Sequence, residues 1–425
     1  MVREYKDSGI TWIGRIPQDW NTTKLGSLYT QRNEKVSDKD YAPLSVTMQG
    51  ILPQLETAAK TDDGDNRKLV KKGDFAINSR SDRRGSCGIS PYDGSVSLIN
   101  TILKPRGEMN PNFYNWLFHT SPFADEFYKW GHGIVDDLWT TRWQEMKNIS
   151  VVIPSLEEQQ HIADYLDKKC AEIDGLIELQ ELMIAQLTDY KQSVITEAVT
   201  KGLNPNAELI PSGIDWIGTI PKGWTIGRIK NVAVLYGRIG FRGYTSEDLN
   251  KDGEGAITLS PSNMLPMGMD YSNVTYLSWT KYYESPEIMI QNNDLLMVKT
   301  GSSYGKVSYV NNLPREATIN PQILRIIPKI SSKYLGYFMQ SPIFLYQVEG
   351  GVVGGTIPTI AQEKINNFKI ILPPEHEQLA IVSLLDTKCT EIDSLISLKQ
   401  QKIENLKEYK KSIIFEAVTG KIIID

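Results

Sequence analysis

The nonapeptide LDKKCAEID at Leu166–Asp174 returns 219 residues later as LDTKCTEID at Leu385–Asp393. A second repeated pair lies near the start of each half: SGITWIG at Ser8–Gly14 returns 204 residues later as SGIDWIG at Ser212–Gly218. These matches occur in the same order and are too long to arise by chance. The chain therefore contains two related modules with a common opening segment and a common closing segment.

Between these segments the two modules resemble each other only in outline. Scattered matches remain at an offset of about 220 residues: Gly85 with Gly305, Ile99-Asn100 with Ile319-Asn320, and Ser121-Pro122 with Ser341-Pro342. A common framework with two different central blocks is expected of a protein that recognises two different targets by one mechanism.

The closing segments predict two long helices. Residues 155–200 contain one glycine and no proline, and their apolar residues recur at steps of three, four and seven, the spacing of a coiled-coil stripe. The apolar residues of the second copy occupy the same positions. Each stripe is interrupted at the same place by a polar residue, Gln180 in the first copy and Lys399 in the second. The predicted stripes comprise Leu166, Ile173, Ile177, Ile184, Leu187 and Val194, and Leu385, Ile392, Ile396, Ile403, Leu406 and Ile413.

Connectivity predicts that the two helices run antiparallel. A helix of about 44 residues spans roughly 65 Å, and the short segment Lys201–Ile210 separates the end of the first helix from the second module. The second module therefore follows at the far end, and its helix buries its stripe most simply by running back along the first. In the alternative arrangement, each helix packs on its own module as an ordinary amphipathic core helix.

The expected fold is two mixed α/β globular domains in pseudo-two-fold repeat, joined by two long antiparallel coiled-coil helices. Short apolar runs bounded by glycine and proline, such as Lys72–Asn78 and Asn293–Lys299, predict the strands. The expected segments are the opening segment and first globular domain at 1–154, the first helix at 155–203, the second globular domain at 204–373 and the second helix at 374–425.

Composition argues against several classes of protein. The 425 residues are 40% hydrophobic and 23% charged, as in ordinary globular proteins. No apolar run approaches the roughly 20 residues needed to span a bilayer, so we expect a cytoplasmic protein without a membrane partner. Three cysteines argue against a disulfide framework, and the four histidines show no metal-ligand spacing, so no metal site is expected.

The net charge of −5 is distributed unevenly along the chain. The helical segments 156–203 and 373–425 together carry −8, which leaves +3 on the remainder. The acidic surplus therefore belongs to the repeated helices, and the divergent blocks have a mild basic bias that is compatible with binding a polyanion.

Glycine- and serine-rich loops with basic residues follow the predicted strands. Arg, Lys, Ser and Tyr on such loops reach base edges and phosphate oxygens of DNA, although an ordinary charged turn has a similar composition. Two further loops, 236–244 and 350–356, fit the same use, and 131–142 is the counterpart of the latter. The candidate DNA-binding residues are Arg80, Ser81, Arg83, Arg84, His132 and Arg142, and Arg238, Arg242, Tyr244, Lys299, Ser302, Tyr304, Lys306 and Thr356.

No sequence motif predicts catalysis. The loop Gly301–Lys306 superficially resembles a phosphate-binding loop, but its spacing is one residue short and Val307 stands where a magnesium-binding Ser or Thr is needed. We find no dinucleotide fingerprint and no Ser/Cys–His arrangement at a nucleophile elbow. No catalytic residue is therefore assigned.

Over nearly its whole length, the chain resembles the specificity subunits of type I restriction-modification enzymes. The resemblance rests on the opening Ser-Gly-Ile-x-Trp-Ile-Gly, the Pro-x(3)-Glu-Gln that begins each helix, the Cys-x-Glu-Ile-Asp-x-Leu-Ile within it and the Glu-Ala-Val-Thr at its end, all repeated. The helix ends depart slightly from each other, with Lys-Gly following in the first and Gly-Lys in the second.

The resemblance implies a non-catalytic subunit whose two target-recognition domains each read half of a split, asymmetric site in double-stranded DNA. The helices would set the gap and, through the stripe residues given above, pair with each other and dock two modification (methyltransferase) subunits. Restriction subunits, which are ATP-dependent, would complete the complex. S-adenosylmethionine, ATP and Mg²⁺ are then expected on the partner subunits, and no cofactor is expected on this chain.

Two other functions stay open from sequence. A two-headed adaptor could bind proteins through the two blocks, and the lack of a strongly basic face would favour it, whereas steeply salt-dependent DNA affinity would exclude it. A self-sufficient nuclease or methyltransferase is the other alternative, and it would require a catalytic motif that the sequence does not display.

Overall fold

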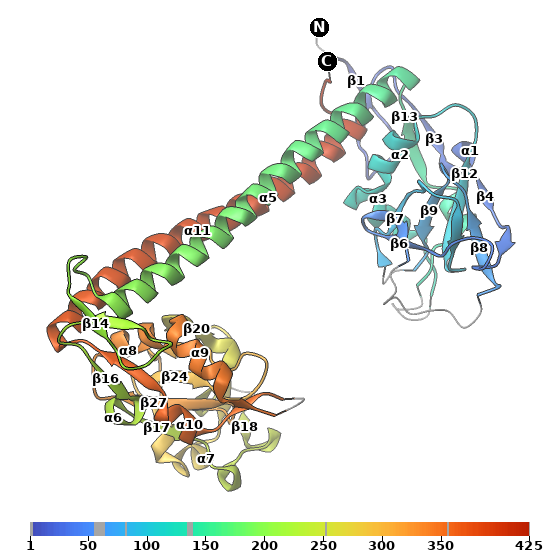
Figure 1. Cartoon of the computed structure of the whole chain (residues 1–425). Helices are drawn as coiled ribbons and strands as arrows, with labels where there is room; N and C mark the ends of the chain where they lie inside the picture. Colours follow the sequence, from blue (N-terminus) through green and yellow to red (C-terminus); the bar gives the residue numbers. More distant parts are fainter. Residues whose placement is uncertain are drawn as a thin grey trace. The chain divides into compact units, whose positions relative to one another are not determined.

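The structure, a computed structural model, describes residues 3–54, 64–80, 83–133, 139–250, 253–354 and 357–424. It divides the chain into two compact units, Met1–Glu181 with Gln400–Asp425, and Leu182–Lys399. Two long helices, α5 (Leu156–Lys201) and α11 (Glu375–Val418), each begin in one unit and end in the other (Figure 1). Two candidate residues, Ser81 and Thr356, lie outside the described residues.

The first unit contains antiparallel sheets covered by short helices. Its strands include β3 (Asn21–Lys24), β4 (Tyr29–Arg32), β5 (Lys35–Val36), β6 (Leu44–Thr47), β7 (Gly50–Pro53), β8 (Arg67–Val70), β9 (Phe75–Asn78), β10 (Cys87–Ile89), β11 (Gly94–Val96), β12 (Asn100–Pro105) and β13 (Ser150–Ile153). The sheets have the orders β10-β9-β12-β4 and β11-β8-β5, and β3 pairs with β13. Helices α2 (Pro111–Phe118) and α3 (Ser121–Lys129) bring aromatic side chains into a core with Phe75 and Tyr29.

The second unit repeats this plan with an enlarged second sheet. Its strands include β16 (Thr225–Arg228), β17 (Ala233–Gly237), β18 (Leu249–Asn250), β19 (Ala256–Leu259), β20 (Met264–Leu265), β21 (Gly268–Met269), β22 (Thr275–Leu277), β23 (Met289–Ile290), β24 (Leu295–Val298), β25 (Val307–Tyr309), β26 (Ala317–Ile319), β27 (Ile323–Pro328), β28 (Val352–Val353), β29 (Thr359–Ile360) and β30 (Lys369–Leu372). The order β17-β27-β24-β25 corresponds to β4-β12-β9-β10 in the first unit, and β16 pairs with β30 as β3 pairs with β13. The other sheet is β18-β22-β19-β26-β23, in which β19 and β26 run parallel.

The helices that cover the second unit also have counterparts in the first. Helices α8 (Ser332–Met339) and α9 (Pro342–Gly351) follow β27 as α2 and α3 follow β12. Tyr334 of α8 donates to Ile371 O over 2.8 Å, and Tyr114 of α2 donates to the equivalent Val152 O over 3.4 Å. The repeat predicted from sequence is therefore confirmed at the level of secondary structure and core contacts.

The repeated opening segment forms a hairpin in each unit. Hairpin β1 (Tyr5–Asp7) and β2 (Arg15–Pro17) corresponds to β14 (Leu209–Pro211) and β15 (Thr219–Pro221). Both connections contain glycines with positive φ, 71° at Gly9 and 78° at Gly14, and 77° and 73° at their equivalents. Side chains rarely tolerate this conformation, which explains why both glycines recur in the motif.

The prediction of an antiparallel helix pair is confirmed in each unit. In the first unit, the start of α5 at Leu166 shares a core with the end of α11 at Val418, and further along Asp174 pairs with Lys410 over 2.7 Å. In the second unit, Ile195 of α5 shares a core with Ile381 of α11, and the helices meet again through a 2.7 Å ion pair between Lys191 and Asp393. The alternative in which each helix packs only on its own module is wrong.

The predicted stripe residues are withdrawn from solvent. Leu166, Ile173, Leu385, Ile392 and Ile403 are buried, and Ile177, Ile184, Leu187, Ile396 and Leu406 are half-buried. The polar position Gln180 is buried as well. None of the described helices combines the length and the apolar run needed to cross a bilayer.

Candidate nucleic-acid interface

In the first unit, loop segments that are distant in sequence meet beyond the end of β9. Thr141 N donates to Ser79 O over 2.9 Å, and His132 and Thr140 exchange two backbone hydrogen bonds of 3.0 Å. Arg80 forms a β-bridge with Thr140. The described parts of the predicted recognition loops of this domain are therefore joined by backbone hydrogen bonds.

Arg84 is held at this surface by a carboxylate and an aromatic ring. Its guanidinium pairs with Asp125 and lies 5.5 Å from the centre of the Tyr128 ring. Trp139 stacks on Tyr128 with 5.7 Å between ring centres. Because 48% of the Arg84 side chain stays exposed, its guanidinium is accessible from solvent beside its partner carboxylate.

The remaining candidates of the first unit are exposed. Arg83 and Arg142 both lie at the surface, and the Arg142 backbone amide donates to Glu145 Oε2 at the start of α4 (Trp143–Met146) over 3.2 Å. His132 Nε2 lies 3.9 Å from Glu145 Oε1, and the imidazole is 75% exposed. These side chains are placed to meet a ligand from solvent.

The second unit builds an equivalent surface with different side chains. Ile360 N donates to Lys299 O over 2.9 Å, in the same topological position as the bond between Thr141 and Ser79. A β-bridge to Thr359 follows at the next residue, Thr300. The loop after β24 is thus tied to β29 by the same backbone device as in the first unit, while the residues that it presents differ.

The candidates on this loop are unequally accessible. Lys299 is half-buried, burial lowers its pKa, and an added Cβ at Gly237 would lie 3.2 Å from its Nζ. Glycine at 237 therefore leaves room for the ammonium group. Ser302 and Lys306 are exposed, whereas Tyr304 packs partly against the core.

The loop after β17 carries the other three candidates of this unit that the structure describes. Arg238 is only 6% exposed, and its guanidinium lies 5.1 Å from the centre of the half-buried Tyr244 ring. Arg242 is 37% exposed and its Nη1 lies 3.4 Å from Glu287 Oε1. Arg238 therefore lies beneath the surface that Arg242 helps to form, a distinction that residue type does not reveal.

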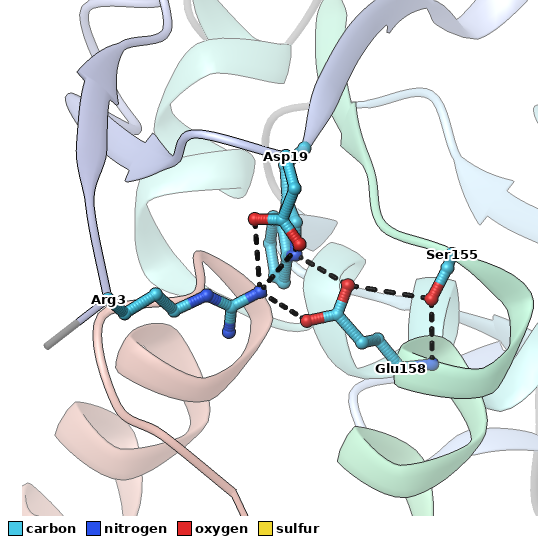
Figure 2. A network of polar contacts seen from close by, with 5 residues as sticks. Arg3, Asp19, Ser155 and Glu158 are labelled. Atoms are coloured by element: carbon cyan, nitrogen blue, oxygen red, sulfur yellow. Dashed lines mark hydrogen bonds and ion pairs between the residues drawn. The ribbon is translucent and has the colours of Figure 1, made fainter. Parts of the chain in front are cut away.

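A polar network fixes the start of α5 in the first unit (Figure 2). Trp20 Nε1 donates to Glu158 Oε2 over 2.9 Å, and Arg3 pairs with both Glu158 and Asp19. Ser155 Oγ accepts from Glu158 N over 3.2 Å, which caps the first turn. In the second unit the equivalent Trp224 and Glu377 repeat the central bond at 3.1 Å.

The network joins two repeated motifs, the opening segment and the Glu-Gln at the start of each helix, through a contact that the sequence does not reveal. A glutamate in the first turn of a helix interacts favourably with the helix dipole. The structure shows in addition that this glutamate accepts a hydrogen bond from the tryptophan that follows the opening hairpin. Each hairpin is thereby fastened to the helix that closes its own module.

A repeated aspartate fastens each globular domain to its helix. In the first unit, Trp116 Nε1 of α2 donates to Asp167 Oδ1 over 2.8 Å. In the second, Tyr337 of α8 donates to the equivalent Asp386 over 2.8 Å, and Lys333 pairs with the same carboxylate. Within each unit, the loop surface therefore has a fixed position relative to the helix.

The helices also carry exposed apolar residues that the predicted stripes do not include. Tyr165, Lys169, Leu176 and Leu179 follow steps of four, seven and three, which places them on one face of α5. Tyr409 of α11 is exposed as well, and it contributes, after burial, to the raised pKa of Tyr165. We call the cluster Tyr165, Leu176, Leu179 and Tyr409 the first outer patch.

The second unit repeats this cluster with the helices exchanged. Leu384, Lys388, Leu395 and Leu398 of α11 are the equivalents on one helix face, and the Tyr190 hydroxyl of α5 contributes, after the Glu391 hydrogen bond, to the raised pKa of Lys388. The second outer patch is Leu384, Leu395, Leu398 and Tyr190. Leu179 and Leu398 are 48% and 61% exposed, so both patches face solvent.

Among the described residues, no three His, Cys, Asp or Glu side chains are grouped so that they could hold a metal ion. The described chain presents two loop surfaces with basic and hydroxyl side chains, and two sets of exposed apolar residues on the helices, the outer patches.

Comparison with known proteins matches a family described as the type I restriction modification DNA specificity domain, over residues 17–183 and 221–408. The MjaVIII type I restriction enzyme specificity subunit of Methanocaldococcus jannaschii is 25% identical over 434 residues, which cover 96% of this chain and 94% of the relative. The EcoKI specificity subunit of Escherichia coli is 24% identical over 208 residues, covering 48% of this chain and 44% of that protein.

Solved structures share the fold. A chain from work on complex assembly and conformational transition of the type I R-M system has a TM-score of 0.73 at 15% identity, covering 96% of this chain and 99% of the other. The HsdS subunit from Thermoanaerobacter tengcongensis has a TM-score of 0.53 at 17% identity, covering 96% and 98%. At these identities the comparison establishes the architecture alone.

Proposed function

Because the chain belongs to the type I restriction modification DNA specificity family, we propose that its two recognition domains, at 1–154 and 204–373, each read one half of a split DNA target. The helices α5 and α11 then set the gap between the two halves. This makes the chain the sequence-reading subunit of a type I restriction-modification complex.

The observation that carries this proposal is the pair of equivalent loop surfaces. The backbone bond from Thr141 to Ser79 corresponds to the one from Ile360 to Lys299. The side chains on the two surfaces differ, with Arg80, Arg83 and Arg84 on the first and Lys299, Ser302 and Lys306 on the second. One scaffold with two sets of donors is suited to an asymmetric target, since base edges differ in their donor and acceptor patterns.

The chemistry is assigned to partner subunits. In this proposal the chain is non-catalytic, modification subunits bind S-adenosylmethionine and methylate the target, and restriction subunits use ATP and Mg²⁺. The DNA specificity family supports a recognition role for this chain, and its own candidate residues are donors to bases and phosphates rather than nucleophiles or bases.

The outer patches are assigned to the modification subunits. Leu176 and Leu179 in the first patch, and Leu395 and Leu398 in the second, are large apolar side chains exposed at equivalent positions. Apolar clusters of this kind on a soluble protein mark sites of association. Two copies of one site support the binding of two copies of one partner.

The direct test is to map methylated adenines by single-molecule sequencing in DNA from cells that express this chain with its modification subunit. Cells that express the modification subunit alone are the control. We expect a split motif, modified on both strands, that depends on this chain. The absence of any chain-dependent motif from a correctly assembled complex would refute the proposal.

A further inference from the structure

Arg238 occupies an unusual place for a basic residue in a DNA-binding loop. It follows β17 directly and is 6% exposed, whereas basic residues that contact DNA from a loop need to reach the surface. Burying a guanidinium removes it from water, and burial lowers the pKa of Arg238. A cation is retained in such a place when its hydrogen bonds are satisfied and serve the fold.

The guanidinium of Arg238 ties the loop to the sheet beneath it. Its Nε donates to Ile319 O over 3.1 Å, and Nη2 donates to Thr318 Oγ1 over 3.0 Å, both on β26. On the loop side, Nη1 donates to Arg242 O over 3.4 Å, and the ring of Tyr244 covers the guanidinium. One side chain therefore restrains both ends of the segment that exposes Arg242.

A lysine cannot replace these contacts. Guanidinium nitrogens point in fixed, diverging directions, so Arg238 serves two strand acceptors and one loop acceptor at once. Lysine has one nitrogen in place of the three that donate to Ile319, Thr318 and Arg242, and an ammonium stacks less well on the Tyr244 ring.

The position equivalent to Arg238 in the first recognition domain does not carry an arginine. With the offset of 204 that relates Trp20 to Trp224, the position of Arg238 corresponds to Glu34. The Glu34 side chain is 58% exposed and lies 3.9 Å from Arg32. Arg238 is therefore not part of the scaffold common to the two domains, and it is associated with the loop of one domain only.

We propose that Arg238 is a positioning residue for sequence recognition: it fixes the main chain at Gly240–Arg242 and the ring of Tyr244 in the arrangement that reads the second half-site, and it does not contact DNA itself. The inference rests on the proposed function and adds to it a residue that sets specificity from below the interface.

The test uses the complex of the full chain with its modification subunits and compares Arg238→Lys with the wild type. We expect methylation to spread to sequences with altered bases in one half of the motif, with the other half unchanged. Discrimination against a single mismatch, ordinarily about 5- to 150-fold, should fall about tenfold at one or more positions of that half-site.

Salt dependence separates positioning from direct contact. Each phosphate contact contributes about 0.9 to the slope of log affinity against log salt concentration. We expect the slope of Arg238→Lys and of Arg238→Met to equal that of the wild type. A slope lowered by about one unit in Arg238→Met would overturn the proposal, because it would show that the guanidinium contacts a phosphate.

Two further variants guard against a general loss of structure. Thr318→Val removes one acceptor of Arg238 on the buried strand, and it should relax the same positions more weakly. Arg315→Lys is the matched control, because Arg315 also donates to a carbonyl, Gly253 O, over 2.9 Å and lies over aromatic rings in the same unit.

The outcomes distinguish this inference from the proposed function. A wild-type complex that methylates a split motif, together with an Arg238→Lys complex that methylates the same motif with the same discrimination, would overturn the role of Arg238 alone. Equal relaxation by Arg315→Lys, or relaxation of both halves, would also overturn it. A wild type without any motif would refute the proposed function.

Discussion

Lys410 Nζ lies 2.7 Å from both carboxylate oxygens of Asp174, and this contact fixes the register between α11 and α5 in the first unit. The residues 219 positions away, Asp393 and Lys191, form the same ion pair in the second unit with the two helices exchanged. Both pairs are partly exposed, with Asp174 52% and Asp393 57% accessible. Such pairs contribute little stability, so their main effect is to favour one register over others.

Reversing one charge of this pair tests its role in register. Asp174→Lys should lower the free energy of unfolding by about 1 kcal/mol, because it replaces an attraction by a repulsion. The double variant Asp174→Lys with Lys410→Asp should recover most of that loss. Thermal unfolding of the full chain measures both. Lys407→Asp, which disturbs only the exposed pair with Glu404 within one helix, is the control and should change stability less.

Exchange of the central block of the first module tests whether each domain recognises its own half of the DNA target. Replacing residues 21–153 by the corresponding block of another family member should change one half of the methylated motif and leave the other half and the gap intact. The reason is that the Lys299 and Arg238 loops of the second unit remain unchanged. Adenine methylation mapping gives the answer, and a change in both halves would contradict it.

The length of the helices sets the expected gap. Seven residues inserted after Glu181 and after Gln400 lengthen each helix by about 10 Å and preserve the stripe, which corresponds to roughly three base pairs of DNA. We expect the gap in the methylated motif to grow by about that amount while both half-sites stay the same. An unchanged gap in an active complex would show that the helices do not measure the spacing.

Substitutions in one outer patch should change the number of modification subunits bound per chain. Leu176→Ser with Leu179→Ser should weaken one of two partner sites at least tenfold, since each exposed leucine buried on association contributes about 1–2 kcal/mol. Native mass spectrometry should then show one modification subunit per chain instead of two. The equivalent changes at Leu395 and Leu398 should have the same effect.

Combining the four substitutions should abolish partner binding without unfolding the chain, because these side chains are exposed in the free protein. Glu178→Gln, on the same exposed stretch of α5, is the matched control and should retain two partners. Retention of both partners by the fourfold variant would remove the patches from the interface.

The cysteines predict a pH dependence of alkylation. Burial raises the pKa of Cys170 to about 11 and that of Cys87 to about 12, and the thiolate is the reactive form. At pH 8 the folded chain should therefore react slowly with iodoacetamide, and labelling should rise as the pH approaches 11. Unfolded chain, in which thiols titrate near 8.5, should react readily at pH 8. Rapid labelling of folded Cys170 at pH 8 would contradict the burial.

Raised thiol pKa values also act on stability. The folded state holds these protons more tightly than the unfolded state, so the contribution of the thiols to stability is complete below about pH 8.5 and declines as the pH rises toward 11. This direction matches the expected increase in labelling at high pH.

The helical part of the fold is predictable from sequence because its determinants are local and periodic. The stripe from Leu166 to Val194 predicts the first helix and its buried face. The matching stripe on the second helix, together with the short connecting segment Lys201–Ile210, predicts that the two helices pair antiparallel. The outer residues Leu176 and Leu179 are missed because they fall outside the stripe. They could have been found as leucines outside the stripe that recur 219 positions later, at Leu395 and Leu398.

The loop surfaces are only partly predictable. Residue type identifies Arg80, Arg84 and Lys299 as candidates, but the backbone bond between Thr141 and Ser79 joins residues 62 positions apart, and nothing in local spacing encodes it. Arg238 shows the same limit in another way, since its burial under the loop depends on Thr318 and Ile319, eighty residues further along the chain.

Each unit contains the beginning of one long helix and the end of the other, and this arrangement affects when each unit can fold during synthesis. The core of the first unit includes Ala417 and Val418, which are synthesised after the whole stretch Leu182–Lys399 of the second unit. N-terminal domains usually fold first as a chain emerges, but this one lacks part of its own interior until the final helix has left the ribosome. Synthesis that stops before the end of α11 therefore leaves the first unit without these two core side chains, although every residue of its globular domain has been made.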